Sequence, residues 1–279
     1  MRIGVYVFGL ASVAAGIMDL VWGEFEAAHQ PIQALRDHIP GIKILAYIAA
    51  IWLIAAGAAI LWRSTARSGA GALAIIYFIF AAFLFPRFYT APHFLGHHPG
   101  IYIGPLAGVG QQLILVVAAV IVYTSLGARD RLSGASLSLR AALIARWIFG
   151  LCSIDFGLAH LTGVHGVALM IPKWMPFGGD FWTIFTGTAF VVAGLAIISG
   201  ILDVLAARLL ALMLLVFSAF VLAPMILAYP HNHIAWGGNA YNLAAVGAAW
   251  IFADWLSTLL HPAQNLASLH NDLLRDPSS

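Results

Sequence analysis

The chain has very little charge. Only 9% of its 279 residues are Asp, Glu, Lys or Arg, whereas 62% are hydrophobic. A water-soluble domain carries about 25% charged residues, which cover its surface. The composition therefore excludes an ordinary water-soluble globular protein. It predicts an integral membrane protein whose first partner is the lipid bilayer.

Cysteine is almost absent as well. Cys152 is the only one in the sequence, which excludes an intrachain disulfide and dithiol redox chemistry of the Cys-x-x-Cys type. The excess of positive charge is also small. A formal net charge of +2 is ordinary for the loops of a membrane protein and gives no reason to expect a nucleic-acid partner.

Long apolar runs are abundant. A run of about 20 apolar residues can cross the hydrocarbon core as a helix, and in lipid the backbone must satisfy its own hydrogen bonds, which excludes open strands. The sequence therefore predicts an all-α integral membrane protein with eight transmembrane helices, near residues 3–23, 42–62, 69–88, 103–126, 142–162, 181–200, 205–229 and 239–259.

Lysine and arginine are distributed unevenly between the two sides of these helices. With eight spans both termini share one side, which takes nine basic residues against four on the other. The side richer in basic residues faces the cytoplasm. We expect a bacterial cytoplasmic (inner) membrane protein with both termini in the cytoplasm. The four basic residues on the outward side are Arg36, Lys43, Arg87 and Lys173.

The two halves of the chain resemble each other. Residues 8–20 and 149–161 are identical at six of thirteen positions, and each half places a proline six residues before a Pro-His pair. These matches occur in the same order in both halves, which indicates an internal duplication. We expect two tandem four-helix membrane units, residues 1–128 and 139–262, followed by a short cytoplasmic tail, residues 263–279.

Histidine is concentrated in two loops at equivalent positions. His93, His97 and His98 follow the third span, and His231 and His233 follow the seventh. An even number of helices in each unit puts both loops on the outward side. Imidazole is a common ligand of zinc, copper and haem iron and titrates near neutral pH. Three interpretations stay open: a metal or haem site, hydrogen bonding to a redox-active head group, or interfacial histidines bonded to water and lipid head groups.

Ionisable residues also lie inside the spans. Asp19 and His160 occupy equivalent positions near the outward ends of the first and fifth spans, and Asp155 lies deeper. Such groups are costly in a membrane and usually face a bundle interior or a cavity. We expect all three to bind a cofactor head group or to handle protons. A satisfied interfacial pair is the alternative for Asp19 and His160.

Small residues and prolines predict how the helices pack. Ser12 and Gly16 stand four residues apart, and small residues at this spacing allow helices to approach closely. Pro86 and Pro224 each remove a helical hydrogen bond, so we expect kinks that open a pocket at the outward end. The amides that are candidates to line this pocket are Gln111, Gln112, Asn239 and Asn242.

The second half carries a recognisable pattern. It consists of Phe149-Gly-Leu, Gly157-Leu-Ala-His160, Ile171-Pro-Lys-Trp-Met-Pro-Phe177, Phe181-Trp182, Thr186-Gly187 and Ala193-Gly-Leu195. This pattern resembles the DoxX-like family of four-helix membrane proteins. The resemblance implies membership in a group that includes the small subunits of thiosulfate:quinone oxidoreductase and the membrane parts of thiol-redox complexes. It also implies roles for His160, Lys173 and Trp174, which match the family pattern.

The leading interpretation is a quinone-linked, redox-associated membrane subunit with an outward-facing pocket rich in histidine. In it His93, His160 or His231 would bond a quinone, with Asp19 or Asp155 as a partner. A soluble or membrane redox partner protein would supply the electron carrier. The alternatives are a non-enzymatic scaffold or stress-related assembly factor, a metal- or haem-binding protein, and a small-solute transporter. The sequence leaves open whether the chain is an enzyme; if it is, it is an oxidoreductase subunit.

Overall fold

The computed structural model describes residues 2–26, 40–97, 99–127 and 135–260, and within these ranges every regular element is a helix. The element η2 is one turn of 3-10 helix, and η3 is a π-helical turn. In chain order the elements are α1 (Arg2–Trp22), α2 (Ile42–Ala59), α3 (Ala66–Leu84), α4 (Arg87–Leu95), η2 (Pro99–Tyr102), α5 (Ile103–Gly127), α6 (Ala135–Thr162), α7 (Val164–Ala168), α8 (Gly178–Ser199), α9 (Asp203–Phe217), η3 (Ser218–Leu222), α10 (Ala223–Ala228) and α11 (His233–Leu260).

Among the described residues, seven helical segments are long and apolar enough to cross a membrane. They match the first seven expected spans and cover residues 2–22, 42–59, 66–93, 100–127, 140–162, 178–199 and 203–228. The expected eighth span lies within α11, which is not among the seven. α11 carries Asn239, Asn242 and Asp254, and more than half of its described residues are buried by other helices.

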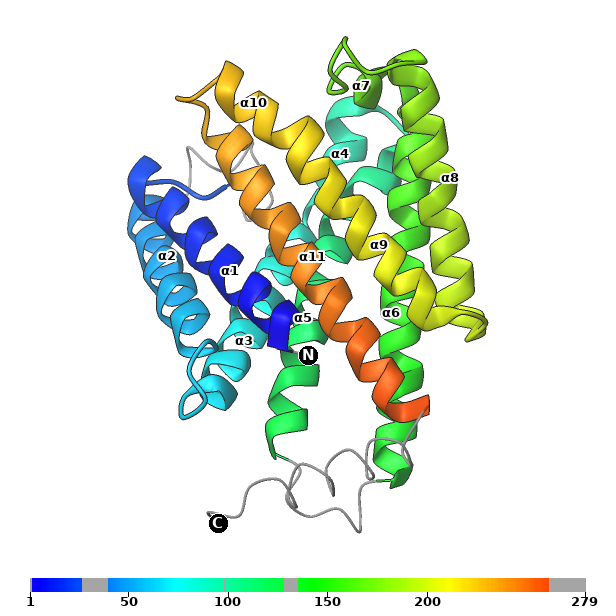
Figure 1. Cartoon of the computed structure of the whole chain (residues 1–279). Coiled ribbons are helices and arrows are strands. Elements are labelled where there is room, and N and C mark those ends of the chain that lie inside the picture. Colours follow the sequence, from blue (N-terminus) through cyan, green and yellow to red (C-terminus); the bar gives the residue numbers. More distant parts are fainter. Residues whose placement is uncertain (1, 27–39, 98, 128–134, 261–279) are drawn as a thin grey trace, which may run out of the picture.

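The helices α5 and α11 contact each other and form the centre of the bundle (Figure 1). α11 packs against α1, α5 and α9, and α5 packs against α3, α6 and α11. The contacts follow the same order in both halves. The pairs α1–α2, α2–α3 and α3–α5 correspond to α6–α8, α8–α9 and α9–α11, and α1–α11 corresponds to α6–α5.

Glycine allows the closest helix crossings. A Cβ atom at Gly16 of α1 would lie 2.6 Å from the carbonyl oxygen of Ala50 in α2, and one at Gly157 of α6 would lie 2.6 Å from that of Gly187 in α8. Real side chains do not tolerate such distances from backbone atoms, so only glycine fits. Close approach recurs about two turns earlier in both crossings, at the pairs Gly9–Gly57 and Gly150–Gly194.

Both expected proline kinks interrupt helices. Phe85 and Pro86 separate α3 from α4, and Phe85 N–H donates to the Ala82 carbonyl at 3.2 Å. That carbonyl, which the missing proline N–H would leave free, is therefore satisfied by a tighter turn. Pro224 follows the π-helical turn η3 and lies at the start of α10. The same residue type thus produces a break in one half and a widened turn in the other.

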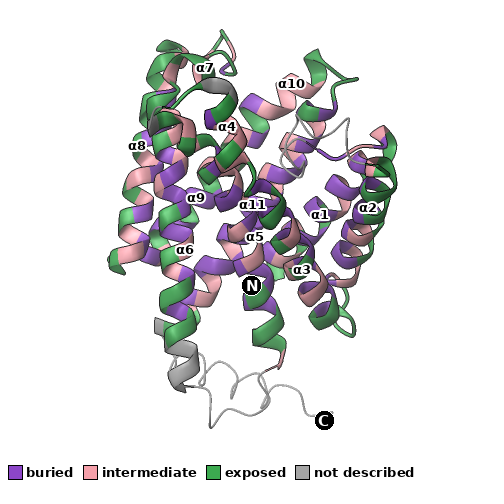
Figure 2. Ribbon diagram, turned by 180° about the vertical axis from the view of Figure 1, so that it is seen from behind, coloured by how far each residue is buried: buried purple, intermediate pink, exposed green. Residues whose placement is uncertain are grey.

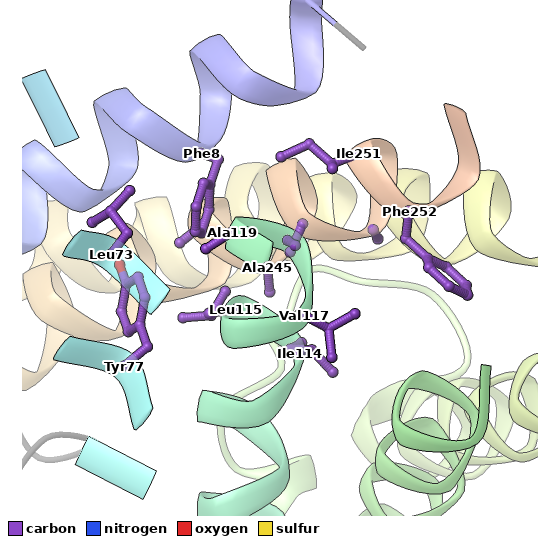
Figure 3. Packing of buried hydrophobic residues seen from close by; sticks show 14 of the residues in the cluster. Phe8, Leu73, Tyr77, Ile114, Leu115, Val117, Ala119, Ala245, Ile251 and Phe252 are labelled. Atoms are coloured by element: carbon purple, nitrogen blue, oxygen red, sulfur yellow. The ribbon is translucent and has the colours of Figure 1, made fainter. Parts of the chain in front are cut away.

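The distribution of buried and exposed side chains is the one expected for a helical bundle in lipid. Buried residues face the interior and exposed ones face outward (Figure 2), yet many of the exposed side chains are large and apolar, such as Ile48, Phe78 and Leu209. The core fills the space where α1, α3, α5 and α11 meet, with Phe8, Tyr77 and Leu115 at its centre (Figure 3). An apolar outer surface of this kind is compatible with contact with a bilayer.

The polar loops gather at opposite ends of the bundle. α4, α7 and α10 lie at the end drawn uppermost in Figure 1, here called the upper end. The start of α1 and the end of α11 lie toward the other end. The two histidine-containing loops, which adjoin α4 and α10, are therefore on one side of the bundle, as the duplicated pattern predicts.

We expect Gly157→Ala to lower the free energy of unfolding by about 1–3 kcal/mol, because the added methyl group meets backbone atoms of α8 that cannot move aside. The measurement is thermal and SDS-induced unfolding in mild detergent. Gly238→Ala in α11 is the matched control, because a Cβ there meets no atom within 4 Å. Equal losses in the two variants would contradict the close crossing.

Candidate functional site

A cavity of about 510 Å³ opens between the central helices α5 and α11 and the helices α6, α8 and α9. It extends toward the upper end of the bundle, where Arg87 of α4 and Val167 of α7 border it. Small-molecule sites in proteins have volumes of roughly 300–1,000 Å³. The cavity is therefore large enough to hold a ring-sized ligand.

The cavity is largely apolar. Four phenylalanine rings line it: Phe149 and Phe156 of α6, Phe190 of α8 and Phe217 of α9. Phe149 also stacks on Phe252 of α11, with ring centroids 4.2 Å apart and the planes 3° from parallel, so this wall is fixed by core packing. The side chains that line the cavity farthest from the upper end are Ile114, Leu210, Ala245 and Ala249.

Two polar side chains of α6 reach the cavity. Ser153 donates its hydroxyl hydrogen to the Phe190 carbonyl at 2.8 Å. The Nδ1 atom of His160 lies 2.8 Å from the Phe156 carbonyl, and because a carbonyl only accepts, Nδ1 carries the hydrogen. The imidazole packs between aromatic rings, with centroid distances of 5.3 Å to Phe190 and 6.2 Å to Phe217. Its position and its tautomer are therefore both fixed by the protein.

Two polar side chains of α11 face them across the cavity. Tyr241 donates its phenol hydrogen to the Gln111 backbone carbonyl of α5 at 2.7 Å. Asn242 donates both amide hydrogens, to the Leu214 carbonyl at 2.7 Å and to Ser218 Oγ at 2.9 Å. Ser153, His160, Tyr241 and Asn242 all line the cavity and are together called the polar belt below.

The π-helical turn η3 shapes the wall opposite α6. Proline has no N–H, and its ring needs space where the preceding helical turn would lie. The chain before Pro224 widens accordingly into η3, whose Val221 and Leu222 line the cavity. The two hydrogen bonds from Asn242 hold this turn against α11. Single π-turns occur frequently at functional sites.

Charged side chains border the cavity at its upper end. Glu26, just after α1, and Arg87 of α4 both line it, and the two groups interact electrostatically. The Glu26 backbone N–H donates to Asp19 Oδ1 at 2.9 Å. Glu26 also packs directly on Gly237 of α11, where a Cβ would collide with its side chain.

Asp19 lies in a buried cluster of titratable side chains at the start of α11. Its Oδ1 lies 3.4 Å from Nε2 of His233, which is an ion-pair distance rather than a hydrogen bond. The other ring nitrogen of His233 lies 3.6 Å from Glu24 Oε1, and the ring stacks on Trp22 with centroids 4.9 Å apart. The expected Asp19 site is therefore a junction between α1 and α11, adjacent to the cavity through Glu26.

The expected site residues lie in different places. His160 lines the cavity. Asp155 is buried and is not among the lining residues; its two carboxyl oxygens have no hydrogen-bond partner among the described residues. Lys173 and Trp174 lie exposed in the loop between α7 and α8, where Trp174 makes an edge contact with Phe220.

The loop histidines are dispersed. His93, His97 and His231 are exposed and are not among the residues that line the cavity; His93 stacks on Tyr89 at a centroid distance of 6.4 Å. His98 lies outside the described residues. Within the described part of the chain, no three side chains of His, Cys, Asp or Glu are grouped as metal ligands would be. The metal and haem interpretation stays a prediction.

Two of the four expected pocket amides, Gln111 and Asn242, line the cavity. Several other lining residues carry no sequence signal of their own. The phenylalanines of α6, α8 and α9 look like ordinary span residues, and only the helix packing brings them together. Glu26 was not predicted; an acidic residue three positions after the expected end of the first span, near Asp19, is the one sequence signal that could have identified it.

Comparison with models of protein families, with curated proteins and with solved structures gives no match. The resemblance to the DoxX-like family therefore stays a prediction that rests on the residues quoted above. The arguments below use only the sequence and the geometry of the bundle.

We expect Asp19 and His233 to be energetically coupled. Their side chains are 0% and 8% exposed, so water does not screen the interaction between them, and replacement of either side chain removes it. A double-mutant cycle with Asp19→Asn and His233→Gln, measured by unfolding in detergent, should give a coupling free energy of about 1–3 kcal/mol.

The chain offers a matched control for this cycle in the pair His165 and Asp180. It joins the same residue types at 3.7 Å, but the side chains are 95% and 60% exposed. Because exposed pairs are screened by water, the cycle with His165→Gln and Asp180→Asn should show no measurable coupling. Additive effects at Asp19 and His233 would show that their proximity contributes nothing to stability.

Proposed function

We propose that this integral membrane protein binds the head group of a quinone-type molecule in the cavity. The observation that carries the proposal is the make-up of the cavity wall, which combines four phenylalanine rings with polar side chains contributed by two facing helices, α6 and α11. A quinone head group is a flat ring with oxygen atoms on opposite edges. It needs this combination of aromatic walls and polar groups on two sides.

The position of His160 adds support. It reaches the cavity from α6 while Tyr241 and Asn242 reach it from α11, so the polar groups that bond a ring can approach from both edges. The neighbouring charges of Glu26, Asp19 and His233 connect this region to the upper end of the bundle. Protons exchanged by a bound head group would have titratable side chains nearby.

Under this proposal the chain is a quinone-linked, redox-associated subunit, and a partner protein supplies the electron carrier. The proposed orientation has the upper end facing outward and both termini in the cytoplasm, as the distribution of Lys and Arg favours. Quinones are membrane-dissolved, so a site within the bundle is accessible to them without an extramembrane domain.

We also propose that α11 is the eighth span and that the chain is a tandem duplication. At 28 residues α11 is about 42 Å long, more than a bilayer core requires. The corresponding helix pairs and the glycine crossings described above support two related units.

The spacing of matched residues supports the duplication further. Identical residues stand 137 positions apart through α2–α3 and α8–α9, whereas Pro86 and Pro224 stand 138 apart. One extra residue between them is what a single π-turn accommodates, and η3 lies just before Pro224. The matched residues before the turn are Gly57 and Gly194, Ile60 and Ile197, Ala70 and Ala207, and Phe80 and Phe217.

The test is a lipid extraction of the protein purified in mild detergent, assayed for quinones by mass spectrometry against an unrelated membrane protein. We expect near-stoichiometric, selective enrichment in the native protein. Gly238→Leu should reduce the enrichment at least fivefold, because Gly238 lines the cavity and a Cβ atom there meets no atom within 4 Å. It would occupy the cavity without disturbing the helices.

Gly166→Leu in α7 is the matched control, since a Cβ there also meets no atom within 4 Å and Gly166 does not line the cavity. It should retain the quinone content of the native protein. Quinone at the level of the unrelated protein, or equal content in the two leucine variants, would count against the cavity as a quinone site.

A further inference from the structure

The donor hydrogens of the polar belt are already used in hydrogen bonds within the protein. The hydroxyl hydrogens of Ser153 and Tyr241 go to backbone carbonyls, and both amide hydrogens of Asn242 go to Leu214 and Ser218. His160 uses Nδ1–H for the Phe156 carbonyl. None of these hydrogens is available to a ligand unless a bond within the protein is broken.

What remains in the belt are acceptors. A neutral imidazole with hydrogen on Nδ1 has a lone pair on Nε2, and an amide with both hydrogens engaged still has its Oδ1 oxygen. The hydroxyl oxygens of Ser153 and Tyr241 likewise keep lone pairs after donating. The belt therefore presents nitrogen and oxygen acceptors from α6 on one side and from α11 on the other.

Donors at the cavity are located elsewhere. Arg87 borders the upper end and interacts with Glu26. The side-chain amide of Gln111, also a lining residue, can turn either its donor or its acceptor side toward a ligand. These groups reach a ligand from α4 and α5, whereas the acceptors of the belt stand on the two facing helices that would hold the edges of a ring.

We propose that the cavity selects the reduced, hydroxyl-bearing form of its ring ligand, a hydroquinone, over the oxidised quinone. The inference rests on the proposed function and specifies the redox state bound. A hydroquinone donates O–H from opposite edges of the ring, which satisfies acceptors on α6 and α11. A quinone offers only carbonyl oxygens, and each would face a lone pair and leave a buried acceptor unpaired.

His160 is the acceptor that we assign to one hydroxyl group of the ligand. It is the polar-belt side chain whose remaining acceptor is a nitrogen, the stronger base of the set, and two phenylalanine rings fix its plane. Its equivalent in the first half, Asp19, accepts the Glu26 N–H instead.

The experiment compares the two redox states of one probe on the full chain in lipid nanodiscs. A decyl-substituted 1,4-benzoquinone and its hydroquinone, prepared under anaerobic conditions, are titrated separately by calorimetry. We expect the hydroquinone to bind at least tenfold more tightly than the quinone. His160→Phe, which keeps an aromatic ring and removes the acceptor, should weaken hydroquinone binding about tenfold and leave quinone binding unchanged.

Ser153→Ala provides a second, smaller change in the belt and should weaken hydroquinone binding severalfold, again without effect on the quinone. His93→Phe on α4 is the control, because His93 does not line the cavity, and it should bind both forms as the native protein does. Thermal unfolding of each variant verifies that the bundle is intact.

Different results would contradict the proposed quinone site and the proposed preference for the reduced form. Equal affinity for both forms, or tighter binding of the quinone, overturns the inference and leaves the quinone site in place. Absence of binding by either form overturns the proposed function as well. Selectivity that persists unchanged in both His160→Phe and Ser153→Ala overturns the assignment of the polar belt as its source.

Discussion

Hydrogen bonding inside an apolar bundle constrains everything else in this protein. In lipid no water is available to polar hydrogens, so each must find an acceptor within the chain. Ser12 and Thr186 illustrate this in their helices: each hydroxyl donates to the carbonyl four residues earlier. The same requirement applies around the cavity, where it consumes the donors of the polar belt. The hydrogen bonds that the bundle makes internally thus decide which polar atoms of the cavity are left for a ligand.

Under the proposed duplication, Ser12 and Ser153 stand at equivalent positions, and the residues that pack around them differ. In the first half, Ser12 lies 2.8 Å from the hydroxyl of Tyr77, and this large buried side chain fills the space between α1 and α3. At the 137-residue spacing the second half has Leu214 in place of that tyrosine, and Leu214 lines the cavity beside Ser153. Loss of one aromatic ring and widening of the next turn into η3 leave space in one half that the other half fills.

Sequence patterns predicted those parts of the structure that depend on residues close together in the chain. Apolar runs predicted eight spans, and seven of them are helices long and apolar enough to cross a membrane, because length and hydropathy decide insertion. Gly16 indicated a close helix crossing, and only glycine fits there. The cavity depends on which helices meet, which periodicity does not encode. His233 was grouped with the loop histidines nearby in sequence, but it contacts Asp19, more than 200 positions away. His160 was identified because a titratable group inside a span needs a cavity or a partner.

The proposed preference for the reduced ligand would have a thermodynamic consequence. Binding linkage requires that a site which holds the hydroquinone more tightly also makes the bound quinone easier to reduce, by about 30 mV for each factor of ten in a two-electron couple. The cavity would therefore favour electron delivery to its ligand, and a redox partner would act as the donor. Tight retention of the product would then oppose its release. The charged upper end, with Glu26 and Arg87 beside the cavity, is where a change in pairing would weaken that retention.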